Sequence, residues 1–181
     1  MAALSGMLHV SVLTFLTLLF SQAALHKLSD LRRFSGYVAD YGVLPPRLTL
    51  PVTRLLAGAE ALAIALALIP AASQTGLVLM GALLALYGGV MLLALRRGKR
   101  RIDCGCGGVA QPLSRLLVVR NGLLLALAAL AALTGHAPVA LPNLAVAMVG
   151  GVLLWASYQL LEQLLRLHSL RAALTPDAVN P

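Results

Sequence analysis

The chain has 181 residues, of which 60% are hydrophobic and 11% are charged, and its formal net charge is +8 at pH 7. Polar side chains are too few to cover a soluble domain, so this composition excludes a soluble globular protein and indicates a bilayer. The basic residues stand in short clusters at the ends of apolar runs, which favours lipid headgroups and argues against nucleic acid as a partner.

Five apolar segments follow one another along the chain, each close to the ~20 residues that a helix needs to cross about 30 Å of hydrocarbon. Backbone polar groups inside a bilayer must be satisfied within the segment, so each segment is predicted to be a helix. Pro51 suits the first turn of the second helix, and Pro70 suits its end. The predicted spans cover residues 8–25, 52–69, 77–95, 114–133 and 141–165.

These segments predict an all-α integral membrane protein, a bundle of five transmembrane helices in a single domain over residues 1–171, followed by a flexible tail at 172–181. Small residues recur at four-residue spacing in two spans, and we expect them to pack helices within the bundle, with a homo-oligomer seam as the alternative. They are Gly81, Ala85, Gly89, Ala147 and Gly151. The predicted interfacial anchors are Tyr37, Tyr41, Trp155 and Tyr158.

The basic residues predict the orientation of the chain. With five spans, the amino terminus and the loops around 71–76 and 135–143 share one side of the membrane, and they contain no Lys, Arg, Asp or Glu. All fourteen Lys and Arg residues fall on the other side, which the positive-inside rule assigns to the cytoplasm. We therefore predict an outer amino terminus, an inner carboxyl terminus and a cytoplasmic loop at 96–112, in a bacterial cytoplasmic membrane.

The alternative for the first segment is a cleaved signal peptide, because Ser21-Gln22-Ala23 has the small residues of a cleavage site. A signal peptide normally carries a positive region before its apolar run, and no basic residue precedes this one. We therefore expect the first segment to span the membrane.

The cytoplasmic loop contains both cysteines of the chain, in the sequence RRGKRRIDCGCGG. The adjacent arginines favour the thiolate form, which is the nucleophile in disulfide exchange. A bond between Cys104 and Cys106 would close a ring over a single residue, a strained geometry that makes a disulfide easy to reduce. We predict a catalytic redox pair. Its supporting residues are Arg101, Asp103, Gly105 and Gly107.

Two other interpretations of the cysteines are open. They are two incidental loop thiols, or they bind a metal. A zinc site commonly needs four ligands, and on this side the chain adds only His26 and His168, neither at motif spacing. A metal site would therefore need two chains that each give two thiolates, and we predict none within one chain.

Ionisable residues also lie inside the predicted spans. Glu60 follows Arg54 by six residues, which places it roughly 9 Å deeper in the membrane. Arg120 and Asn121 lie at a comparable depth, and Lys27 closes the first span. Since an isolated carboxylate is costly in lipid, we expect Glu60 to pair with Arg120 or Lys27. Such a pair could fix how helices dock, or it could serve a proton or quinone site.

A set of residues spread over about 21–131 forms a recognisable pattern: Ala24-Leu25-His26-Lys27-Leu28-Ser29-Asp30, Phe34, Tyr41, Leu44-Pro45, Glu60, Asp103-Cys104-Gly105-Cys106-Gly107 and Arg120-Asn121. This pattern resembles the MauE family of methylamine-utilisation membrane proteins, within the wider DoxX-like group. The family usually has phenylalanine after the second cysteine, where this chain has Gly107. The resemblance implies a DoxX-like four-helix core plus one helix, and a protein that assists disulfide formation or maturation of a partner together with a thioredoxin-like protein.

Together these observations predict a membrane thiol-disulfide redox protein, and thus a candidate oxidoreductase, in which one cysteine forms a mixed disulfide and the other resolves it. By analogy with other membrane thiol oxidoreductases, a quinone is a candidate electron partner. Disulfides form mainly outside the cytoplasm, so the predicted cytoplasmic loop fits exchange with a cytosolic thiol reductant or with the membrane. The alternatives are a non-enzymatic scaffold or assembly factor, and a small transporter that uses Glu60 and Arg120.

Overall fold

The computed structural model describes residues 2–98, 113–134 and 139–174, so the predicted redox loop with Cys104 and Cys106 lies outside the described residues. Five helices are long and apolar enough to cross a membrane, which confirms the predicted all-α membrane architecture. In chain order, the elements are α1 (Ala2–Ser29), α2 (Leu31–Asp40), α3 (Pro46–Leu68), the 3-10 helix η1 (Pro70–Ala72), α4 (Ser73–Arg96), α5 (Arg115–Leu133) and α6 (Leu141–Leu174).

Helix α3 begins at Pro46, six residues before the predicted start of the second span. Pro46 stands in the first turn, where its missing N–H costs no hydrogen bond, and Pro45 precedes it in an extended conformation. The expectation that Pro51 occupies the first turn is wrong, because Pro51 lies inside the helix. The predicted end is confirmed: α3 stops at Leu68, and Pro70 opens η1.

Helix α2 is a short helix that the sequence did not predict. It lies between the first and second predicted spans. Asp30 caps it, because its Oδ1 accepts a hydrogen bond from the backbone N–H of Arg33 at 2.9 Å. Phe34 is buried, whereas Arg32 and Arg33 are exposed. Ten residues are too few to cross a bilayer, so α2 packs on α3 as an amphipathic helix at one end of the bundle.

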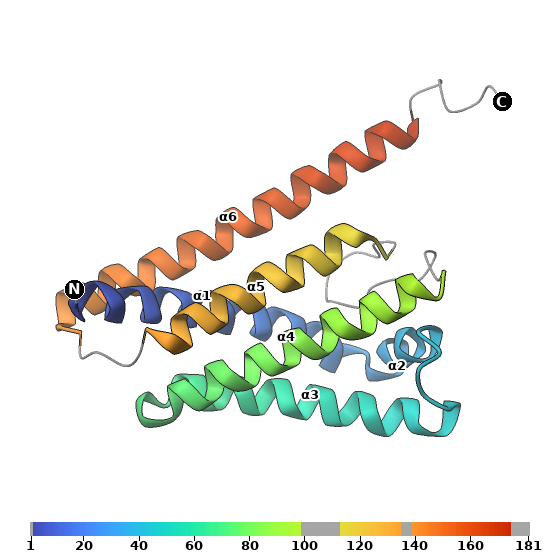
Figure 1. The fold of residues 1–181 in the computed structure, drawn as a ribbon, viewed down its shortest axis with the longest axis horizontal. Helices are drawn as coiled ribbons and strands as arrows, with labels where there is room; N and C mark the ends of the chain where they lie inside the picture. Colours follow the sequence, from blue (N-terminus) through green and yellow to red (C-terminus); the bar gives the residue numbers. More distant parts are fainter. Residues whose placement is uncertain (1, 99–112, 135–138, 175–181) are drawn as a thin grey trace.

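Helix α1 holds the bundle together, because it packs on α3, α4, α5 and α6. Helix α4 in turn packs on both α3 and α5. Figure 1 shows the start of α1, η1 and the start of α6 at one end of the bundle, and α2, the end of α4 and the end of α6 at the other. Towards its carboxyl end, α6 diverges from α5 and the other helices (Figure 1).

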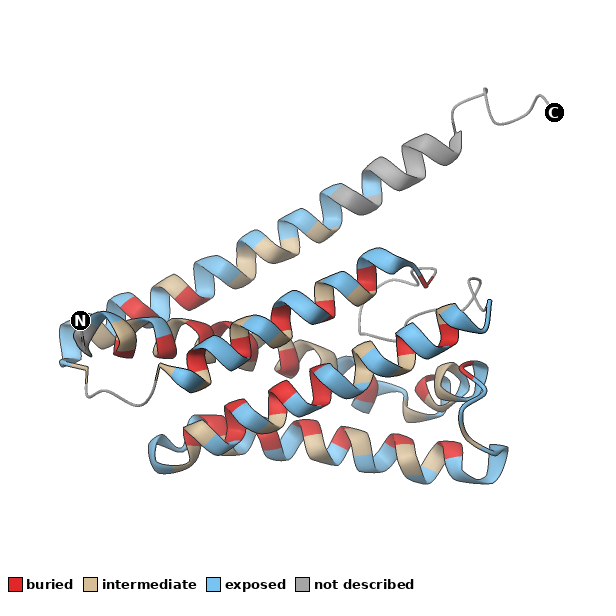
Figure 2. Ribbon diagram, in the orientation of Figure 1, coloured by how far each residue is buried: buried red, intermediate tan, exposed pale blue. Residues whose placement is uncertain are grey.

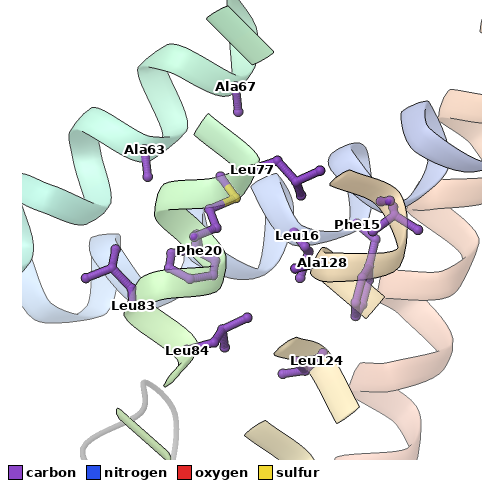
Figure 3. Packing of buried hydrophobic residues seen from close by; sticks show 13 residues of the cluster. Phe15, Leu16, Phe20, Ala63, Ala67, Leu77, Leu83, Leu84, Leu124 and Ala128 are labelled. Atoms are coloured by element: carbon purple, nitrogen blue, oxygen red, sulfur yellow. The ribbon is translucent and has the colours of Figure 1, made fainter. Parts of the chain in front are cut away.

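The main hydrophobic core joins α1, α3, α4 and α5 (Figure 3). Leu16, Leu77 and Met80 are fully buried there, and small residues such as Ala63 and Ala128 let the helices approach closely. Many leucines are exposed on the helices. Figure 2 shows that each helix has buried residues on one side and exposed residues on the other. An apolar outside around a packed inside matches a protein surrounded by lipid.

Helix α6 docks on α1 through a close backbone approach at Gly151. A Cβ atom at Gly151 would lie 2.5 Å from the carbonyl oxygen of Ser11 and 2.6 Å from the Cβ of Thr14. One turn earlier, the carbonyl of buried Ala147 accepts a hydrogen bond from Ser11 Oγ at 2.9 Å. The small-residue stripe of the last span thus packs inside the bundle, in agreement with the prediction.

Candidate functional site

A cavity of about 310 Å³ lies within the bundle, and all six α-helices contribute to its wall. Most of the wall is apolar, with Phe20, Leu56, Leu84 and Leu124 among its residues. The polar residues of the wall form two main clusters, each built from a glutamate, a cation and a tyrosine. Ligand pockets of about 300–1,000 Å³ typically combine apolar walls with a few placed polar groups, so this cavity is the candidate functional site.

The first cluster, the Glu60 cluster, consists of Glu60 on α3, Lys27 near the end of α1 and Tyr87 on α4. The Lys27 ammonium donates to Glu60 Oε1 in a buried salt bridge, and the Tyr87 hydroxyl donates to the same oxygen at 2.5 Å. Lys27 Nζ also lies 4.7 Å from the ring centroid of Tyr87 and 5.0 Å from that of Phe34. Two aromatic faces and one carboxylate thus compensate for the loss of water around this cation.

The second carboxylate oxygen of Glu60, Oε2, differs from Oε1 in its hydrogen bonding. Glu60 is 0% exposed, yet its Oε2 has no hydrogen-bond partner among the described residues. Glu60 is also part of the cavity wall. Since buried polar atoms in proteins are nearly always hydrogen-bonded, this oxygen is an acceptor to which a molecule in the cavity could donate.

The second cluster, the Glu162 cluster, has the same composition on other helices. Arg120 on α5 donates to Glu162 Oε1 on α6, and the Tyr158 hydroxyl donates to the same oxygen at 2.9 Å. The side chains of Arg120 and Glu162 are 21% and 28% exposed, so this ion pair is more open than that of Glu60. Next to this cluster, Gln159 Nε2 on α6 donates a hydrogen bond to Gln22 Oε1 on α1 at 2.7 Å. Both glutamines line the cavity.

Asn121 connects the cavity to the end of the bundle where the redox loop begins. Its Nδ2 donates to the carbonyl of Leu117 at 3.0 Å and contacts Met91 Sδ at 3.6 Å. Met91 and Tyr41 line the cavity and also pack in a second hydrophobic cluster with Leu113. Leu113 is the first described residue after the loop. The chain that leaves the loop therefore packs in the same cluster as two residues of the cavity wall.

The structure brings some of the predicted site residues into contact with one another. Glu60 pairs with Lys27, one of the two expected partners, whereas the carboxylate partner of Arg120 is Glu162. Asn121 is buried on the cavity wall. The predicted redox residues lie outside the described residues: Arg101, Asp103, Cys104, Gly105, Cys106 and Gly107. Among the described residues, no group of three or more His, Cys, Asp or Glu side chains could hold a metal ion.

Sequence reasoning did not find Tyr87, Tyr158 or Glu162 as site residues, although a signal was present. Glu60 and Glu162 are the two glutamates of the chain, and each lies in an apolar span. Tyr158 precedes Glu162 by four residues, a spacing that places two side chains on the same face of a helix. Intramembrane carboxylates are functional candidates by default, so Glu162 could have been chosen by the rule that selected Glu60.

The fold and the site together define a multi-pass helical membrane protein with a mostly apolar cavity bounded by one buried and one half-buried polar cluster. The family profile described as methylamine utilisation protein MauE matches residues 5–134, which contain the first four spans. The chain belongs to the MauE family.

Curated relatives of that name support this membership. The protein from Paracoccus denitrificans is 42% identical over 131 residues, which are 71% of this chain and 69% of the relative. The protein from Paracoccus versutus is 34% identical over 156 residues, which are 84% of each chain. The protein from Methylorubrum extorquens is 39% identical over 135 residues, or 72% of each chain. No solved structure gives a significant match.

Proposed function

We propose that this chain is a thiol-disulfide redox protein of the bacterial cytoplasmic membrane, which exchanges a disulfide through Cys104 and Cys106 with a thioredoxin-like partner and so assists the maturation of another protein. The observation that carries the proposal is that both cysteines of the chain stand one residue apart, between glycines and beside a basic run. Thiolate chemistry and a strained, reducible bond both follow from that placement.

The exchange balances in either direction. When the chain oxidises its partner, the bond between Cys104 and Cys106 breaks, a partner thiolate forms a mixed disulfide, and a second partner thiolate then releases the chain as a dithiol. Two electrons move from the partner to the chain. The printed names of the relatives place those proteins in methylamine utilisation. For this chain we propose the accessory role in maturation, with no binding of methylamine itself.

The first test is the trapping of a mixed disulfide. We expect Cys104→Ser and Cys106→Ser, each expressed alone, to differ: the variant that keeps the attacking cysteine retains a thioredoxin-fold protein in a covalent complex, because the resolving thiol is missing. Non-reducing electrophoresis and mass spectrometry of the complex would identify the partner. The double serine variant is the control. Full complementation by the double variant would instead support the scaffold alternative and overturn the redox proposal.

The second test concerns orientation, for which the positive-inside distribution supports a cytoplasmic loop at 96–112. We expect a thiol reagent that cannot cross membranes to label the native cysteines only after the cells are permeabilised. The control is Ala71→Cys in a cysteine-free chain. Ala71 is exposed in η1, which joins α3 to α4 at the end of the bundle opposite the end of α4 (Figure 1), so the new cysteine should react in intact cells. Labelling of the native cysteines in intact cells would reverse the orientation.

A further inference from the structure

The buried acceptor of Glu60 is the starting point for a ligand assignment. Its Oε1 already receives Lys27 and Tyr87, whereas Oε2 is buried without a donor from the described residues. Glu60 is one of the residues that line the cavity. Leaving a buried polar atom unsatisfied is costly, so the position favours a cavity occupant that donates a hydrogen bond. The occupant must therefore carry an O–H or N–H group on an otherwise apolar body.

The charges of the cavity restrict the occupant further. Lys27 balances Glu60, and Arg120 balances Glu162, so both ion pairs on the wall are internally neutral. A charged ligand would enter a mostly apolar space in which both ion pairs are already balanced, and the loss of its hydration would not be compensated. A lipid phosphate or a fatty-acid carboxylate would in addition face the carboxylate of Glu60, which has the same sign of charge. The site therefore fits a neutral molecule.

The two clusters also restrict the shape of the occupant. They lie on different helices, with Glu60 held from α1, α3 and α4, and Glu162 from α5 and α6. Each combines a carboxylate acceptor with charged N–H donors. A flat ring with one oxygen at each end could use both: its hydroxyls donate when it is reduced, and its carbonyls accept when it is oxidised.

We propose that this cavity binds the ring of a lipid-soluble quinone, with one oxygen at the Glu60 cluster and the other at the Glu162 cluster. The apolar wall residues, including Phe20 and Leu124, contact the ring faces. The isoprenoid tail leaves between α5 and α6, which both line the cavity and diverge towards the carboxyl end of α6 (Figure 1). Quinones dissolve in the bilayer, so the ligand would enter the cavity from the surrounding lipid.

A quinone in this cavity would accept electrons from the cysteines of the redox loop. This role rests on the proposed thiol chemistry. The thiols of Cys104 and Cys106 lose two electrons and two protons as their disulfide forms, and the quinone takes up both to become a quinol. Leu113, which packs against cavity residues Met91 and Tyr41, follows Cys106 by seven residues. Seven residues span at most about 25 Å of extended chain, which limits the distance between Cys106 and Leu113.

The binding test uses a chain without cysteines, so that it does not depend on thiol chemistry. Cys104→Ser/Cys106→Ser protein in nanodiscs is titrated with short-chain ubiquinone and menaquinone analogues, and the fluorescence of Trp155 is followed. Trp155, the only tryptophan, precedes the cavity residues Tyr158 and Gln159 by three and four positions on α6. We expect saturable quenching by at least one analogue, because a quinone bound in the cavity lies near this indole.

The variant that tests the assignment is Lys27→Met/Glu60→Gln, which removes both buried charges together and so leaves neither unpaired. We expect it to weaken quinone binding at least about tenfold, the effect of losing a hydrogen bond to a charged group. Circular dichroism and thermal unfolding establish that the variant folds. If the parent chain folds but this variant does not, Glu162→Gln at the more open cluster takes its place with the same expected direction.

The control is Gln74→Met, because Gln74 bonds to the carbonyl of Ala132 and does not line the cavity. It should bind the analogues with the affinity of the parent chain. Quenching that never saturates, or equal affinity in the parent and in the cluster variant, would overturn the quinone site. If a mixed disulfide is trapped but no quinone binds, the proposed function stands and the quinone site fails. If a quinone binds but no mixed disulfide is trapped, the quinone site stands and the proposed function fails.

Discussion

Lys27→Met should lower the free energy of unfolding by about 3–5 kcal/mol, the usual cost of removing one partner from a buried ion pair. Glu60 is 0% exposed and Lys27 is 3% exposed, so neither water nor lipid headgroups can replace the lost ammonium. The substitution keeps an apolar chain of similar length, and it therefore changes the charge far more than the packing. The measurement is unfolding of the purified protein in detergent by titration with dodecyl sulfate, followed by circular dichroism.

A double-mutant cycle separates the cost of the unpaired charge from other effects. Lys27→Met/Glu60→Gln should recover most of the lost stability, because replacing both members of a buried ion pair is often close to neutral. Arg120→Met supplies the comparison at the Glu162 cluster, where the two side chains are 21% and 28% exposed and a smaller loss is expected. If Lys27→Met is no more harmful than Arg120→Met, the ion pair between Lys27 and Glu60 does not hold α1 and α3 together.

The sequence was informative about the Glu60 pair because charge in an apolar span is rare and must be compensated. Counting residues from the membrane edge gave the depth of Glu60, Lys27 and Arg120. Depth does not determine the direction in which a side chain leaves its helix, so it could not decide between Lys27 and Arg120 as the partner. The structure resolves this through helix packing, since α1 packs on α3 and brings Lys27 to Glu60.

The cavity could not be predicted from the sequence for a related reason. Its volume depends on the angle at which α6 leaves the bundle, and the apolar pattern of a span does not contain that angle. The tyrosines were difficult for another reason, because Tyr158 also fits the role of an interfacial anchor. The start of α3 was missed because the prediction placed Pro51 in the first turn, whereas Pro46 occupies that turn and the helix continues through Pro51.

Gly151→Ala should lower the free energy of unfolding by about 1–3 kcal/mol, the usual cost of overpacking a close contact. The new Cβ would stand 2.5 Å from the carbonyl oxygen of Ser11. Rotation of the Thr14 side chain leaves its Cβ in place, and the carbonyl oxygen of Ser11 moves only with α1, so α6 must shift outward. Unfolding of the purified variant by titration with dodecyl sulfate, followed by circular dichroism, measures the loss.

The neighbouring position gives a closely matched control. A Cβ at Gly150 would meet only the hydroxyl oxygen of Ser11, at 3.4 Å, so Gly150→Ala should be neutral or gain up to about 1 kcal/mol from helix propensity. The two variants have the same composition and differ only in the face of α6 that carries the new methyl group. An outward shift of α6 would also move Tyr158 and Glu162 away from α5, so Gly151→Ala, but not Gly150→Ala, should weaken quinone binding. Equal stability of the two variants would show that α6 does not depend on this contact, and the cavity would then need another support.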